Sequence, residues 1–193
     1  RLYLYAYLYF VDSYLLFEVK NQPVWRFNFT DDSGQLSIPI SLDLILKNLD
    51  DTKALGEKLA ECCSNLEYPC VIYLIGDLGV GKTTLAQNFI KYFGFIKVKS
   101  PTYTLVESYQ NENVDIHHFD CYRLTDPEEL EYIGIREYLK PRCLQLIEWP
   151  ELGKGVLAKS DISIELSGNG DIRNAKITFQ TDLGQSIKEC AIG

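Results

Sequence analysis

The hydrophobic positions along the chain follow, in turn, the periods of strands and of helices. Residues 41–48 alternate as a first strand, and residues 52–65 have the spacing of a helix that buries one face, with Asp50 or Asp51 as its expected N-cap. Five consecutive apolar residues at 71–75 are typical of a buried strand, and residues 84–91 again predict a helix. This alternation of strand and helix is typical of α/β proteins.

The second half of the chain adds strands that pair locally. The sequence predicts a hairpin whose second strand is 114–120, with a turn at 111–113, and then a buried strand at 143–147. Asp126 and Pro127 indicate the start of a helix, and Gly134 interrupts the pattern before a second short helix. The final segments, 161–166 and 175–180, alternate as two antiparallel edge strands around a turn at 168–170.

The N-terminal segment differs from the rest. Residues 1–17 alternate aliphatic residues with tyrosine, which favours a strand, and Asp31 to Gly34 predict a turn. Asp12 interrupts the apolar run, and no small-residue cleavage site follows, which argues against a signal peptide or a membrane span. We interpret 1–40 as an extension of unknown role and 41–193 as the main domain. With no methionine even at position 1, the sequence is expected not to begin at its natural start or to carry a non-native segment.

Between the strand at 71–75 and the helix at 84–91 lies the pattern G-x-x-x-x-G-K-T, from Gly76 to Thr83. Glycine allows the backbone N–H groups to wrap closely around phosphate groups, and the following helix directs its positive end at them. Lys82 would reach the β- and γ-phosphates, and Thr83 would offer its hydroxyl to Mg²⁺. We therefore predict a P-loop NTPase-like three-layer sandwich, with a central, mostly parallel sheet and antiparallel edge strands.

Two acids are candidate metal or water ligands because each ends an apolar strand, where α/β proteins place their ligands. These acids are Asp120 and Glu148. Hydroxyl groups in the Ser100-Pro101-Thr102 stretch are candidates for a switch that senses the γ-phosphate, although an ordinary turn explains the stretch equally well. Of His117 and His118, at most one faces the site, because adjacent strand residues point in opposite directions, and a structural or partner-facing role is expected for both.

Composition limits the partners. The formal net charge of −8 argues against a surface that grips nucleic acid directly, since phosphate contacts need lysine and arginine. The six cysteines form no C-x-x-C pair, which argues against a zinc or redox motif, and we expect them to be buried thiols of a reduced, cytoplasmic chain. No association with a membrane is expected.

Four motifs together resemble one family. Gly76 to Thr84, Ser100 to Glu107, His118 to Leu124 and Ile147 to Pro150 occur in the order and rough spacing of the TsaE (YjeE) family, the bacterial ATPase subunit of the machinery that makes threonylcarbamoyladenosine in tRNA beside the anticodon. The resemblance covers about residue 42 to the C-terminus. The extension at 1–40 has no counterpart in it, and Cys121 stands where leucine is common.

The resemblance implies an ATPase that resets a complex with TsaD and TsaB, that uses ATP and Mg²⁺, and that meets tRNA only through those partners. It implies catalytic roles for Lys82, Asp120 and Glu148, and Mg²⁺ ligation by Thr83 and Glu148. The predicted nucleotide-binding residues are Thr52, Asp77, Leu78, Gly79, Val80, Gly81, Lys82, Thr83, Thr84 and Trp149. With no obvious arginine finger, weak hydrolysis by the isolated chain is expected. A small-molecule kinase, or a scaffold that binds nucleotide without turnover, are the alternatives.

Overall fold

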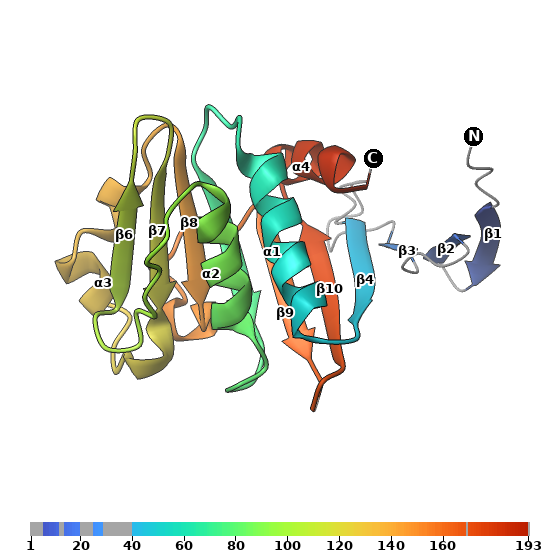
Figure 1. Ribbon diagram of the computed structural model, residues 1–193, viewed down its shortest axis with the longest axis horizontal. Coiled ribbons are helices and arrows are strands. Elements are labelled where there is room, and N and C mark those ends of the chain that lie inside the picture. Colours follow the sequence, from blue (N-terminus) through green and yellow to red (C-terminus); the bar gives the residue numbers. More distant parts are fainter. Residues whose placement is uncertain (1–5, 12–13, 20–24, 29–39, 169, 193) are drawn as a thin grey trace.

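The computed structural model describes residues 6–11, 14–19, 25–28, 40–168 and 170–192, and its strands form one sheet (Figure 1). The order of the described strands is β1-β2-β3-β4-β10-β9-β5-β8-β7-β6. The strands are β1 (Ala6–Val11), β2 (Tyr14–Val19), β3 (Trp25–Asn28), β4 (Ile40–Leu46), β5 (Cys70–Ile75), β6 (Val106–Gln110), β7 (Asp115–Asp120), β8 (Cys143–Glu148), β9 (Ile162–Ser167) and β10 (Arg173–Phe179). The helices are α1 (Leu49–Cys63), α2 (Lys82–Tyr92), α3 (Glu129–Tyr132) and α4 (Asp182–Ile192), with short 3₁₀ turns η1 (Cys121–Arg123), η2 (Ile135–Tyr138) and η3 (Pro150–Gly153).

The centre of the sheet is parallel, as predicted. Strand β5 pairs in parallel with β8 and β9, and β8 pairs in parallel with β7. Antiparallel pairs flank this centre, with β6 beside β7 at one end and β10 and β4 beside β9 toward the other. Since parallel strands place their carboxyl ends along one edge of the sheet, the ends of β5, β7 and β8 lie together.

Apolar side chains cover both faces of the sheet, which makes the three-layer arrangement. Ile72 and Leu74 of β5 face a core closed by α1, α2 and α4, with Phe89 and Ile187 among its members. Their neighbour Val71 faces the opposite way, into a smaller cluster under α3, η2 and η3. Strand alternation produces this division, because successive side chains of β5 point to opposite faces.

The two C-terminal strands are not edge strands, contrary to the prediction. Strand β10 lies between β9 and β4, and β9 pairs with β5. The alternating pattern correctly indicated one buried face for each strand. It carries no information on whether both hydrogen-bonding edges are paired, because that depends on strands distant in sequence. The turn at 168–170 includes Asn169, which lies outside the described residues.

Helix boundaries also differ from those predicted. The N-cap of α1 is Asn48, not Asp50 or Asp51; its Oδ1 accepts the Asp51 N–H at 2.9 Å, while Asp51 Oδ2 accepts the Lys47 N–H at 2.7 Å. The two bonds resemble a capping box, except that the Asp51 carboxylate accepts the N–H of Lys47, the residue before the N-cap. The helix expected from Asp126 is only four residues long, and it is preceded by an Asx-type turn in which Asp126 Oδ1 accepts the Glu128 N–H at 2.9 Å. Helix α4 was not predicted at all.

At the N-terminal side, β1, β2 and β3 form an antiparallel series that reaches β4 through β3 (Figure 1). The predicted strand character of 1–17 is confirmed for residues 6–11 and 14–17, and β2 continues to Val19. The predicted turn at 31–34 lies outside the described residues. The division of the chain at residue 40 stays a prediction.

The cysteines are not all thiols. A disulfide joins Cys62 of α1 to Cys190 of α4, which corrects the expectation of a fully reduced chain. The partners are 128 residues apart, so no local spacing could indicate the pair. Cys63, Cys70, Cys121 and Cys143 are buried thiols. Within the described ranges, no helix is both long enough and apolar enough to cross a membrane.

Candidate phosphate-binding site

The glycine-rich loop runs from the end of β5 to the start of α2, as the motif predicts. Gly76, Gly79 and Gly81 all have positive φ, at 139°, 78° and 112°. A Cβ on Gly76 would collide with the backbone oxygen of Leu166 in β9, and one on Gly81 would lie 3.3 Å from Arg173 Nε. Glycine is therefore required both by the backbone conformation and by the closeness of the neighbouring strands.

Replacing Gly76 with alanine should lower the free energy of unfolding by about 3 kcal/mol, because left-handed strain adds to a collision with backbone that cannot move aside. Gly79→Ala is the control: its φ of 78° is also positive, but nothing lies within 4 Å of its Cβ, so a loss of about 1 kcal/mol is expected. Urea unfolding of both variants measures the difference, and equal losses would contradict a close approach between the loop and β9.

Lys82 is the first residue of α2 and its side chain turns back into the loop. It is buried, with 4% exposed, and its Nζ donates to the carbonyl oxygens of Gly76 at 2.6 Å and Asp77 at 2.9 Å. The ammonium group also lies 4.0 Å from the centre of the Trp149 ring. Burial lowers the pKa of Lys82, and the carboxylates of Glu148 and Asp120 oppose that shift. These contacts hold one positive charge inside the loop.

Thr83 and Glu148 meet beside Lys82. The Thr83 hydroxyl donates to Glu148 Oε2 at 3.0 Å, and the Glu148 side chain is almost completely buried. The other carboxylate oxygen, Oε1, accepts a hydrogen bond from His118 Nε2 at 2.8 Å. His118 is therefore at the site, contrary to expectation. His117 points away from it, and its Nδ1 is hydrogen-bonded to the Ser108 Oγ at 2.8 Å. This confirms that only one of the two histidines faces the site.

Asp120 lies directly beside Glu148, because these two residues are paired in the register of β7 and β8. Its Oδ2 accepts from the Thr102 hydroxyl at 3.0 Å, and its Oδ1 accepts the Tyr122 N–H at 3.1 Å. Thr102 in turn lies 2.8 Å from the Ser100 hydroxyl. The structure thus brings together the strand-end acid and the Ser100-Pro101-Thr102 stretch, which sequence reasoning could place only separately.

Trp149 follows Glu148 in a left-handed conformation, with φ at 56°, which is rare for a residue with a bulky side chain. This conformation ends β8 and places the indole over Lys82, where the Tyr122 ring lies 5.0 Å from it. The predicted position of Trp149 beside the loop is confirmed, while its contact with nucleotide stays a prediction.

The other predicted nucleotide-binding residues are distributed around the loop. Leu78 is 73% exposed at its tip, and Thr84 belongs to the first turn of α2. Thr52 packs against Gly81, but its side chain is fully buried and its hydroxyl has no partner in the described structure. Thr52 therefore offers no surface to a base in this conformation.

Sequence reasoning did not identify Arg173 as part of the site. This residue begins β10, and its Nε donates to the Val80 carbonyl of the loop at 2.7 Å. It reaches the loop only because β9 and β10 lie inside the sheet. The alternating pattern of β10 gave no indication in the sequence that Arg173 contacts the loop.

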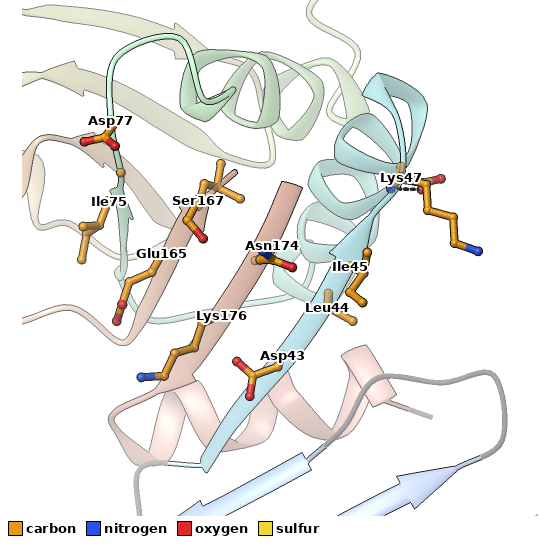
Figure 2. Close-up of a pocket in the computed structure, with 14 residues that line it drawn as sticks. Asp43, Leu44, Ile45, Lys47, Ile75, Asp77, Glu165, Ser167, Asn174 and Lys176 are labelled. Atoms are coloured by element: carbon orange, nitrogen blue, oxygen red, sulfur yellow. Dashed lines mark hydrogen bonds between the residues drawn. The ribbon is translucent and has the colours of Figure 1, made fainter. Parts of the chain in front are cut away.

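A pocket of about 1110 Å³ lies next to the loop but not over its lysine. Figure 2 shows Asp77 at one side of it and Asp43, Glu165 and Lys176 on the strands below. Its lining includes Gly76 and Asp77, and none of Lys82, Thr83, Asp120 or Glu148. These four candidate residues therefore lie outside this hollow.

The donor set at the strand ends suits Mg²⁺, which prefers a few carboxylate and hydroxyl oxygens and keeps several waters. Thr83 and Glu148 supply such oxygens, and Asp120 lies next to them. In the part of the chain that the structure describes, no group of three or more histidine, cysteine or acidic residues could hold a metal alone, so further ligands would come from phosphate and water.

Burial raises the pKa of Cys121 to about 12, which excludes a thiolate nucleophile there.

The sheet order and the strand–glycine loop–helix unit define an α/β protein of the P-loop NTPase-like class. The family model described as "Threonylcarbamoyl adenosine biosynthesis protein TsaE" matches residues 46–176. The chain is 47% identical to the tRNA threonylcarbamoyladenosine biosynthesis protein TsaE of Haemophilus influenzae over 135 residues, which are 68% of this chain and 85% of that protein. The TsaE protein of Bacillus subtilis is 33% identical over 133 residues, covering 68% of this chain and 80% of the relative.

Among solved structures, YdiB of Bacillus subtilis superposes with a TM-score of 0.65 at 24% identity, over 79% of this chain and 94% of that one, and supports the same fold. The chain belongs to the TsaE family, whose members take part in the biosynthesis of threonylcarbamoyladenosine in tRNA.

Proposed function

We propose that this protein is a Mg²⁺-dependent ATPase whose turnover drives or resets the complex that forms threonylcarbamoyladenosine next to the anticodon of tRNA. The observation that carries the proposal is the convergence of three groups from separate elements: Lys82 Nζ inside the glycine loop, the Thr83 hydroxyl at the start of α2, and the Glu148 carboxylate at the end of β8. Membership of the TsaE family supplies the biological process.

The residues present fit ATP and Mg²⁺. The glycine loop leaves no room for a Cβ at Gly76, and its N–H groups, together with the N-terminus of α2, provide donors and positive potential for phosphate oxygens. Thr83 and Glu148 would hold the metal. Bound Mg²⁺ supplies charge neutralisation on the phosphate oxygens. Lys82 adds a positive charge already held close to the loop carbonyls.

Asp120 is the residue that we assign to orienting the attacking water. Each of its oxygens already accepts one hydrogen bond, from Thr102 and from the Tyr122 N–H, and a carboxylate oxygen accepts two. The carboxylate is therefore held in one orientation with acceptor capacity left for a water. Thr102 couples this acid to the Ser100-Pro101-Thr102 stretch, which we assign as the switch that responds to the γ-phosphate.

Turnover by the isolated chain should be slow and should rise at least about 10-fold when TsaB and TsaD are added, because the two arginines near the site are engaged elsewhere. Arg173 donates from Nε to the Val80 carbonyl oxygen and from Nη1 to the Asp171 carbonyl oxygen. Arg123, the nearest candidate in sequence, has its guanidinium 4.6 Å from the Tyr103 ring, which is 85% exposed. Phosphate release by the purified chain, with and without the two partners, measures the effect. Full activity of the chain alone would contradict partner dependence.

The same preparation separates the alternative functions. Transfer of the γ-phosphoryl group to a small metabolite, in place of release to water, would indicate a kinase; the acidic stretch from Asp126 to Glu131 is a poor phosphate-covering lid and weighs against it. A scaffold role would be indicated if Glu148→Ala and Asp120→Ala variants bound the partners and supported tRNA modification without turnover.

A further inference from the structure

One feature of the site is assigned no role by the P-loop chemistry: a fully buried histidine behind the acidic residue. His118 is 0% exposed and lies on β7 two residues before Asp120. In the register of β7 and β8, His118 pairs with Leu146 and Asp120 pairs with Glu148. His118 is therefore one step deeper in the protein than Glu148, on the same face of the sheet.

On β7 and β8 the neighbours of His118 on its face of the sheet are apolar up to Glu148, whereas on β6 its cross-strand partner is Glu107. Ile116, two residues before it on the same face, and Leu144 and Leu146 on the adjacent strand belong to the main core under α1 and α2. An aliphatic side chain would continue this pattern. A buried imidazole is unfavourable unless hydrogen-bonded, and the bond to Glu148 Oε1 at 2.8 Å is the one that the structure provides.

The bonding also defines which nitrogen is the donor. Nδ1 of His118 is buried and has no hydrogen-bond partner within the described structure. Since the partner of Nε2 is a carboxylate oxygen, which accepts, Nε2–H is the donor. His118 thus makes a single hydrogen bond, and that bond is to the candidate metal ligand.

We propose that His118 is a positioning residue for Glu148. The hydrogen bond from His118 Nε2 to Oε1 fixes the carboxylate so that Oε2 faces the Thr83 hydroxyl. This is the orientation in which Glu148 and Thr83 would together hold Mg²⁺. This inference rests on the proposed function, because it assigns Glu148 to Mg²⁺. A partner behind a metal ligand fixes its orientation, and loss of such partners typically weakens metal affinity about 10- to 100-fold.

Two substitutions separate positioning from simple packing. His118→Gln places an amide N–H₂ close to where Nε2 lies and keeps a donor for Glu148. His118→Asn is also a buried amide, but it is shorter by one methylene and cannot reach Oε1. His117→Asn is the neighbouring control, because His117 faces the other side of the sheet and contacts Ser108 and the Tyr138 ring.

In the first measurement, Mn²⁺ is titrated into each protein in the presence of a non-hydrolysable ATP analogue, and electron paramagnetic resonance detects the bound metal. The second measurement is the Mg²⁺ concentration that gives half-maximal turnover. For His118→Asn we expect the Mn²⁺ affinity to fall about 10-fold or more and the Mg²⁺ concentration for half-maximal turnover to rise by a similar factor. His118→Gln should recover most of the affinity. His117→Asn should leave both quantities unchanged. The affinity for a fluorescent ATP analogue, measured in EDTA, should stay within about 2-fold of the wild type in all of the variants.

The outcomes test the proposed function and the positioning role of His118 separately. If the wild-type chain binds neither Mn²⁺ nor nucleotide, the proposed function is wrong. If the wild-type chain binds both and His118→Asn binds Mn²⁺ equally well, or His118→Gln is weakened as much as His118→Asn, the positioning role is wrong and the ATPase proposal stands. Should His118→Asn fail to fold, His118→Leu restores an apolar core and is expected to show the same loss of metal affinity.

Discussion

Replacing Lys82 with alanine is expected to lower the rate of ATP hydrolysis in the presence of the partners about 1000-fold. The lysine is the one cation held inside the glycine loop in the described structure, through hydrogen bonds to the carbonyl oxygens of Gly76 and Asp77. A preorganised charge in a water-poor site stabilises developing negative charge far more than an exposed one, and removing one such donor typically costs 10²- to 10³-fold. Steady-state phosphate release measures the loss.

Lys91→Ala is the matched control, since it removes an exposed lysine from the last turn of the same helix. Its rate should equal that of the wild type. The folded state should tolerate Lys82→Ala, because burial lowers the pKa of Lys82 and so already disfavours its charge. A rate within 10-fold of the wild type in the Lys82→Ala variant would show that the loop lysine does not contact the reacting phosphates.

The change Glu148→Gln should reduce turnover about 100- to 1000-fold while leaving metal-free nucleotide binding within about 2-fold of the wild type. The amide keeps the size of the side chain but removes its negative charge, and hard cations such as Mg²⁺ bind charged oxygens. Because Glu148 Oε2 lies 3.0 Å from the Thr83 hydroxyl, the other candidate metal ligand, the substitution should weaken metal binding and not the contacts to the phosphates. The dependence of the rate on Mg²⁺ concentration is the measurement.

Glu57→Gln provides the comparison, because Glu57 is an exposed acid of α1. It should have the rate and Mg²⁺ dependence of the wild type. If Glu148→Gln instead weakened nucleotide binding in EDTA and kept its Mg²⁺ dependence, Glu148 would act on the loop itself. Metal ligation would then fall to Asp120.

The phosphate loop was predictable because its determinants are local. Five apolar residues, a G-x-x-x-x-G-K-T run and a helical period lie within about twenty positions, and each glycine has the positive φ that the tight turn needs. The convergence of Asp120 and Glu148 was also predictable, since acids that end parallel strands lie together at one sheet edge. Their direct pairing in the register of β7 and β8 follows that rule.

Residues that contact the site from a distance were not predictable. His118 was expected to be structural or to face a partner, and its bond to Glu148 depends on how β7 and β8 are aligned. Arg173 contacts Val80 across 93 positions of sequence. In each case the pattern along one strand shows which face a side chain occupies, but the residue it meets belongs to another strand.

By itself, the sequence determined the order of strands and helices up to β10, the phosphate-binding loop and the two strand-end acids, because hydrophobic period, glycine spacing and strand ends are properties of short segments. Only the tertiary structure decided that β9 and β10 lie inside the sheet, that Cys62 pairs with Cys190, and that His118 supports Glu148. The physical reason is the same for all three. Strand neighbours, disulfide partners and buried hydrogen bonds are selected by packing between segments far apart in the chain, and a single sequence does not encode those distances in any local pattern.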